Sequence, residues 1–77
     1  MTPDEMRTAR ATIGTMWGLN RPLRMSELGR ALRLDGRDPG ATVRDWERGH
    51  SGISGPVSVA IEAMLAGYNP GKTPEKL

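Results

Sequence analysis

The sequence contains no cysteine and a single histidine, His50, among its 77 residues. Without cysteine the chain has no disulfide bond and no thiolate metal ligand, and one imidazole is too few for a usual zinc site. Apolar runs are short as well, since none approaches the roughly 18 residues that a membrane-spanning helix needs. The polar stretch at residues 1–10 does not resemble a signal peptide. We therefore expect a cytoplasmic protein that binds no metal and does not enter a membrane.

The chain is also too short for most kinds of enzyme. Its 77 residues form at most one small domain, whose core contributes only a few kcal/mol of net stability. There is no glycine-rich phosphate loop after a strand and no room for a deep pocket. We expect no catalysis, no cofactor and no small-molecule substrate. Residues 1–68 are expected to form the domain and residues 69–77, rich in Pro, Gly and Lys, a flexible tail.

Positive charge is carried almost entirely by arginine. Eleven basic and nine acidic residues give a net charge of +2, which by itself is too small to indicate nucleic acid. All of the cations except Lys72 and Lys76 are Arg, which makes forked contacts with phosphate and guanine. A GC-rich genome that favours Arg codons is the alternative explanation. Between Gly49 and Gly71 the only charged residue is Glu62, apart from the titratable His50, so a basic surface and an apolar surface are expected on different parts of the molecule.

Start and stop signals predict two helices in the first half of the chain. The run from Thr2 to Glu5 reads as a capping box with proline at the first helical position, and apolar residues at helical spacing extend this helix to about 3–17. A second helix lies within residues 21–34, capped by Arg24 or Ser26. Gly29 in its interior costs roughly 1 kcal/mol relative to Ala, which indicates that another helix crosses close by.

The second half predicts two more helices. Asp38 and Pro39 repeat the cap-plus-proline signal and start a helix at about 39–48, which Gly49 ends. Ser54 caps a fourth helix, which Gly67 stops. No stretch shows a convincing strand pattern. The expected fold class is therefore all-α, a bundle of four main helices.

The helix at 39–48 has one apolar edge and a polar outer face. At roughly 100° per residue, Val43 and Trp46 face inward. The outer face collects small, basic and acidic residues, which are Ala41, Arg44, Asp45 and Arg48. Such a compact, hydrogen-bonding surface suits a reader of the DNA major groove. The alternative is an ordinary solvated face with ion pairs each worth under about 1 kcal/mol.

The segments "ELGRAL" and "TVRDWERG", joined by a glycine-containing turn, resemble the phage-repressor (Cro-like, XRE-type) helix-turn-helix family of transcriptional regulators. The resemblance extends over about residues 3–67 and includes the opening "TPDEMRTAR" and Gly14. It implies a helix-turn-helix formed by the second and third helices, the third being the recognition helix. It also implies that Glu47 pairs with Arg10 and is structural rather than catalytic. Repressors associated with anti-CRISPR genes are one such type.

The same resemblance implies sequence-specific binding to double-stranded DNA, with Arg44, Asp45 and Arg48 specifying bases. Two features depart from the family pattern, since the turn "DGRDPGA" is several residues longer than usual and Gly40 replaces a common Gln. Arg37 in the long turn is a candidate replacement contact. His50 either touches a phosphate or is a plain loop residue. The complete set of candidate DNA contacts is Arg37, Ala41, Thr42, Arg44, Asp45, Arg48, Arg21, Arg24 and His50.

The fourth helix has more apolar residues than one small core needs. We expect a homodimer interface at Val57, Ile61, Met64 and Leu65, although all of them could instead lie inside a monomer core. A two-fold dimer would place two recognition helices about 34 Å apart, one turn of DNA. The resulting hypothesis is a repressor of an inverted-repeat operator. The rival hypothesis is an antitoxin or small inhibitor that binds a partner protein through the fourth helix.

Overall fold

The computed structural model describes residues 1–70, which form four α-helices and no strand. The helices are α1 (Pro3–Met16), α2 (Met25–Ala31), α3 (Pro39–Arg48) and α4 (Gly55–Leu65). The predicted all-α fold class is confirmed. Within residues 1–70 no helix has both the length and the apolar character needed to cross a membrane. Most of the predicted tail, residues 71–77, lies outside the described part of the chain.

The helices begin at the predicted caps. Thr2 and Glu5 form a reciprocal capping box, in which the Glu5 amide donates to Thr2 Oγ1 at 3.1 Å and the Thr2 amide donates to Glu5 Oε1 at 2.8 Å. Asp38 and Ser54 accept backbone hydrogen bonds at the starts of α3 and α4. Of the two candidates for α2, Arg24 is the cap residue, and its amide donates to Glu27.

All four helices end in the same backbone motif. Each ends at a residue with a positive φ, and two amides turn back to bond carbonyls three and five residues earlier, as in a Schellman motif. This residue is glycine in three cases, Gly18, Gly49 and Gly67. In α2 it is Arg33, with φ of 60°, and the amides of Arg33 and Leu34 bond the carbonyls of Arg30 and Gly29 at 3.0 Å. α2 is therefore the one helix of these four whose ending does not use glycine.

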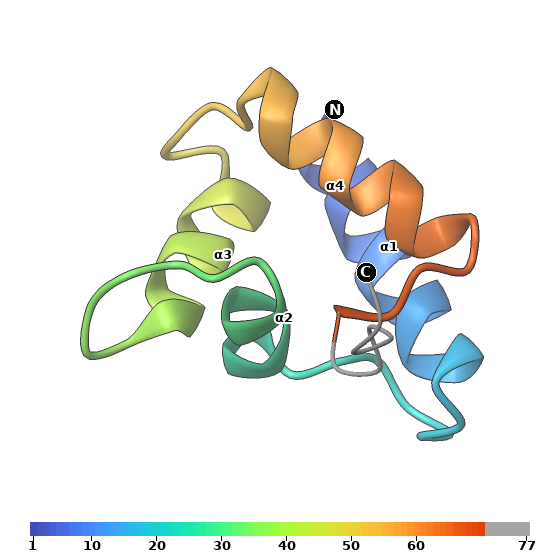
Figure 1. Cartoon of the computed structure of the whole chain (residues 1–77). Coiled ribbons are helices and arrows are strands. Elements are labelled where there is room, and N and C mark those ends of the chain that lie inside the picture. The colour runs from blue at the N-terminus through green and yellow to red at the C-terminus, as the bar shows by residue number, and fades with distance from the viewer. Residues whose placement is uncertain (71–77) are drawn as a thin grey trace, which may run out of the picture.

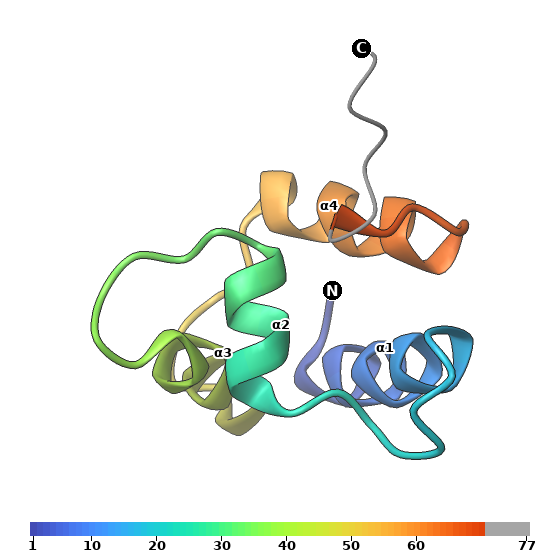
Figure 2. The same cartoon turned by 60° about the horizontal axis from the view of Figure 1, so that its bottom comes forward.

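The helices are arranged so that α3 lies at an edge of the molecule. α2 packs most extensively on α3, and α1 contacts both α3 and α4. Figures 1 and 2 show α4 packed over α1, while α3 lies to one side beside α2. In both views the segment that joins α2 to α3 swings outward on the α3 side. This segment is the long turn noted in the sequence.

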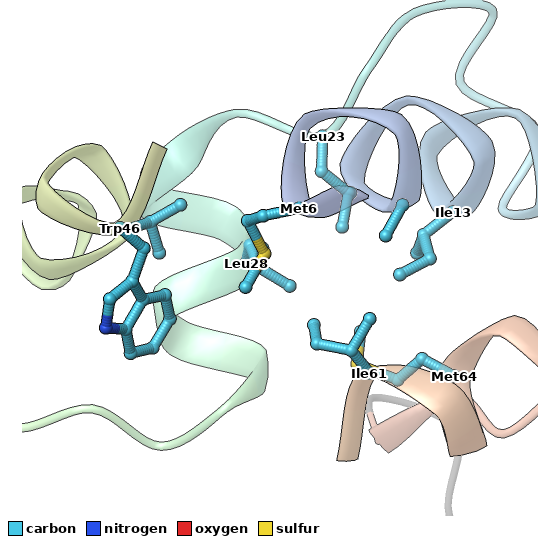
Figure 3. Packing of buried hydrophobic residues seen from close by; sticks show 9 residues of the cluster. Met6, Ile13, Leu23, Leu28, Trp46, Ile61 and Met64 are labelled. Carbon is cyan, nitrogen blue, oxygen red and sulfur yellow. The ribbon is translucent and has the colours of Figure 1, made fainter. Parts of the chain in front are cut away.

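A single core joins all four helices and the link between α1 and α2 (Figure 3). Leu23 of the link is 1% exposed, which shows that this segment is packed and not a loose connection. The nine buried apolar residues are Met6, Ala9, Ile13, Leu23, Leu28, Val43, Trp46, Ile61 and Met64. Because the link takes part in the core, it fixes the position of α2 relative to α1.

Two glycines bring the backbones of α2 and α3 into contact. A Cβ atom on Gly29 would lie 2.4 Å from the carbonyl oxygen of Pro39, and one on Gly40 would lie 2.9 Å from the amide nitrogen of Ser26. Real Cβ atoms essentially never approach so closely, and backbone atoms cannot easily move aside. The prediction that a helix crosses near Gly29 is confirmed, and the neighbour is the first residue of α3. The glycines explain how so short a helix is held against α2.

We predict that Arg33→Gly stabilises the domain by about 0.5–1 kcal/mol. A residue with a Cβ atom is strained in the left-handed region, and glycine removes this strain at some cost in chain entropy. Urea unfolding followed by circular dichroism measures the change. The matched control is Arg30→Gly, which removes the same side chain inside α2 and should lower stability by about 0.5–1 kcal/mol. Equal effects of the two variants would contradict the assignment of strain to residue 33.

Candidate nucleic-acid interface

α3 rests on one apolar edge, as its sequence pattern predicts. Val43 is completely buried and Trp46 is 6% exposed. The indole packs into the core from one side, with Leu28 and Met6 lying further in (Figure 3). Trp46 therefore supports α3 from inside and is not available as a platform for stacking bases.

A buried ion pair fixes α3 to α1. Glu47 is 3% exposed, and Arg10 grips its carboxylate with two donors, Nε to Oε2 at 2.6 Å and Nη2 to Oε1 at 2.9 Å. Arg10 also donates Nη1 to the carbonyl oxygen of Leu23 at 2.7 Å. The pairing expected from the family resemblance is therefore present in the structure. It joins α1, the α1–α2 link and α3 through one guanidinium group.

Arg7 adds a second contact that sequence reasoning missed. Its guanidinium donates to the backbone carbonyl oxygen of Glu47, and its Nε lies 3.8 Å from Glu47 Oε1. Arg7 also pairs with Asp4 on the same helix. The available signal was its spacing of three from Arg10, which places both side chains on one side of α1. Glu47 is thus approached by two cations.

The outer side of α3 brings most of the candidate contacts together. Ala41, Thr42, Arg44 and Asp45 are half-buried, and Arg48 and His50 are exposed. Asp45 Oδ1 lies 4.0 Å from His50 Nδ1, a weak contact unless the imidazole is protonated. Arg48 forms no ion pair with any described residue. The face therefore presents both small residues and an unengaged guanidinium.

Two further candidates lie beside the start of α3. Gly40 packs on the backbone of Met25 and Ser26, which places Arg24, the residue before α2, near the first turn of α3. Arg24 is exposed, as is Arg37 in the long turn. Neither makes an ion pair within residues 1–70. The guanidinium of Arg37 is available to an anion that approaches this end of α3, and that of Arg24 is exposed there while also attracting the Glu27 carboxylate.

Arg21 is engaged inside the protein. Its Nη1 and Nη2 donate to the two carboxylate oxygens of Glu27 at 2.8 and 3.2 Å, and Nη1 also donates to the Pro22 carbonyl at 3.0 Å. The hydrogen bond from Arg21, followed by that from the Arg24 amide, lowers the pKa of Glu27 to about 2. Sequence reasoning missed this pair because residues six apart across an irregular link have no fixed spacing. A phosphate at Arg21 would have to share the guanidinium with Glu27.

The candidate dimer residues of α4 divide between the core and the surface. Ile61 and Met64 are 0% and 1% exposed and pack inside the single chain, where they face Ile13 of α1 (Figure 3). Val57 is half-buried, and Leu65 is 37% exposed. Of the large apolar side chains of α4, Val59 is the most exposed, at 65%. The large apolar side chains of α4 that remain exposed are Val59 and Leu65, which lie about 120° apart around the helix, because Ile61 and Met64 are used by the core.

Comparisons of this chain with protein-family models, with curated proteins and with solved structures find no match. Within residues 1–70 there is no group of three or more His, Asp or Glu side chains that could hold a metal ion.

We predict that Glu47→Gln lowers the free energy of unfolding by about 3 kcal/mol, because it leaves the buried guanidinium of Arg10 without its counter-charge. Thermal or urea unfolding measures the loss. Glu62→Gln is the matched control, since Glu62 is exposed on α4, and its effect should stay within about 0.5 kcal/mol. Similar losses in the two variants would show that the pair does not hold α3.

We also predict that the Arg21–Glu27 pair makes stability depend on acid pH. The folded pKa of Glu27 lies at about 2, below the ordinary value of 4.5. The contribution of the pair to the free energy of unfolding is therefore complete above pH 4.5 and is lost as the pH falls from 4.5 towards 2. Urea unfolding across this range should show a smaller decline for Glu27→Gln than for the unmodified chain. Parallel pH profiles would contradict the assignment.

Proposed function

We propose that this chain is a sequence-specific double-stranded DNA-binding protein of the helix-turn-helix kind, with α3 as the recognition helix. The observation that carries the proposal is the way α3 is held. One side is fixed by Val43, Trp46 and the buried Glu47, while the other side stays open at the edge of the molecule. A recognition helix needs this arrangement, with one side packed rigidly on the domain and the other side exposed to the DNA groove.

The dimensions and side chains of α3 support insertion into the major groove. A helix with its side chains is about 10–12 Å across, and the major groove of B-DNA is about 12 Å wide. Ala41 and Thr42 are small, so the start of α3 can come close to the base edges. Arg44 and Arg48 carry forked donors of the kind that pair with guanine. The ten-residue length of α3 covers a few base pairs without reaching beyond the groove.

We assign different roles to the residues around α3. Arg44, Asp45 and Arg48 would contact base edges, since they lie on the outer side of the helix. Arg24, Arg37, Thr42 and His50 would anchor the phosphate backbone, which fixes the register of the protein on the duplex. Arg21 would contribute mainly through its pair with Glu27, by holding the start of α2.

The proposal includes a homodimer that represses transcription. Two copies related by a two-fold axis would read the two halves of an inverted repeat, about 34 Å apart, and would block polymerase access. Val59 and Leu65 supply exposed apolar surface on α4 for the contact between copies. The operator would include an inverted repeat, for instance in the promoter of its own gene.

The experiment that tests the proposal is selection of bound duplexes from a random DNA library, followed by titration of the best duplex at several salt concentrations. Specific binding predicts recovery of one sequence pattern and a log–log slope near −0.9 for each phosphate contacted. Recovery of an inverted repeat supports the dimer. Absence of binding even at low salt would overturn the proposal.

A second candidate function is protein binding through α4, as in an antitoxin or small inhibitor. It is favoured by the exposure of Val59 and by the lack of charge on α4 apart from Glu62. The same titration separates the two functions, because a protein-binding module has no reason to show a duplex preference or a steep salt slope.

We predict that Arg44→Ala lowers discrimination at one base pair of the selected duplex by about 1–3 kcal/mol. The loss follows because a forked contact to a base edge is removed while the phosphate contacts remain. Competition binding against single-base-pair variants of that duplex measures it. Arg30→Ala is the matched control, since Arg30 is exposed on α2 beside Trp17 and Ala31, in a hollow that no residue of α3 lines. Its base preferences should equal those of the unmodified chain, and equal effects of both variants would contradict the site.

A further inference from the structure

The carboxylate of Asp38 makes two contacts at the start of α3. Oδ1 accepts the Gly40 amide at 3.1 Å and caps the helix, while Oδ2 lies 3.7 Å from Nη2 of Arg44. The two side chains are 60% and 41% exposed, so the pair lies on the surface and beside the proposed DNA face. One oxygen thus serves the helix and the other faces the guanidinium.

The contact directs the guanidinium of Arg44 back along α3 towards the first turn. Arg48, four residues later on the same side, has no such partner among the described residues. An arginine loses side-chain entropy when it is held in one conformation, so a guanidinium already directed by a neighbour loses less on binding. Arg44 keeps donors that do not face Asp38, because a guanidinium has five N–H groups.

The charge of Asp38 changes which acceptors Arg44 can meet favourably. A phosphate that approaches Arg44 also approaches the carboxylate, and the repulsion cancels much of the attraction. A base edge carries no net charge, so guanine N7 and O6 can accept from Arg44 without this penalty. The pair therefore weakens the attraction of Arg44 for the DNA backbone and leaves its hydrogen-bonding capacity for bases.

From these contacts we infer that Asp38 is a positioning residue that reserves Arg44 for base edges and keeps it away from phosphates. The inference rests on the proposed DNA-binding function and adds to it a determinant of specificity. The long turn before α3 then does more than connect two helices, because it places the Asp38 carboxylate beside Arg44 of the recognition helix.

The test is a double-mutant cycle of Asp38→Asn and Arg44→Ala, measured with the best duplex from the random library and with its single-base-pair variants. Asparagine caps helices as well as aspartate does, so α3 should keep its start and the urea midpoint should not move. Asp38→Ser, which also retains a cap, repeats the experiment if the Asn variant unfolds.

Asp38→Asn should bind all duplexes more tightly and raise the magnitude of the log–log salt slope by about 0.9, as Arg44 becomes able to take a phosphate. Discrimination at the base pair that Arg44 reads should fall about fivefold. Both changes should disappear in the Arg44→Ala background, because the carboxylate then has no guanidinium to direct.

Asp35→Asn is the matched control, since it removes the same charge from the same turn, where Asp35 makes no ion pair with a described residue. Its effect should be equal with and without Arg44. If Asp38→Asn likewise acts equally in both backgrounds, or leaves slope and base preference unchanged while the unmodified chain binds specifically, this inference fails and DNA binding stands. If the unmodified chain binds no duplex, both fail.

Discussion

The position of α3 depends on the ion pair between Arg10 and Glu47. α3 has only two apolar anchors, so its hydrophobic contacts alone would leave its tilt and rotation weakly determined. A buried carboxylate costs several kcal/mol of desolvation unless its oxygens are satisfied, and here both oxygens accept from one guanidinium while Arg7 holds the backbone behind it. Since Arg10 also bonds the Leu23 carbonyl, the same group sets the path of the link that leads into α2. The Arg10 guanidinium thus holds together α1, the α1–α2 link and α3.

The arginine content has a different meaning once the partners are known. Arg7, Arg10, Arg21 and Arg44 each face a carboxylate of the same chain. These residues help to build and orient the domain, so a count of arginines overstates the charge offered to a ligand. The arginines without an ion pair in residues 1–70 are Arg24, Arg30, Arg33, Arg37 and Arg48, and three of these lie beside or on α3. The positions of the arginines without an ion pair therefore say more about a ligand site than the total number of arginines does.

Local signals in the sequence predicted nearly all of the fold, because caps, prolines and helix-ending glycines act within a few residues. The helical period likewise predicted the burial of Val43 and Trp46, and the family resemblance supplied the partner of Glu47. The contacts of Arg21 and Asp38 could not be predicted, since they depend on how an irregular link and turn run through space. The burial of α4 could not be predicted either, because the helical periodicity shows which residues share a side of the helix but not which side packs on α1. The sequence leaves Ile61 and Met64 either at an interface or inside a monomer core, and the chain buries both in its own core.

The glycine contacts between α2 and α3 have a consequence for how this domain can change over time. Gly29 and Gly40 join the two helices through backbone atoms, which every residue possesses, so the joint does not depend on the outward side chains of α3. Substitutions on that outer face can therefore alter what the surface recognises without repacking the contact between α2 and α3. Gly29 and Gly40 themselves tolerate almost no substitution, because any Cβ atom would meet backbone atoms. The helix packing can therefore stay the same while the outer face of α3 changes. Related proteins with this fold would then be able to bind different targets.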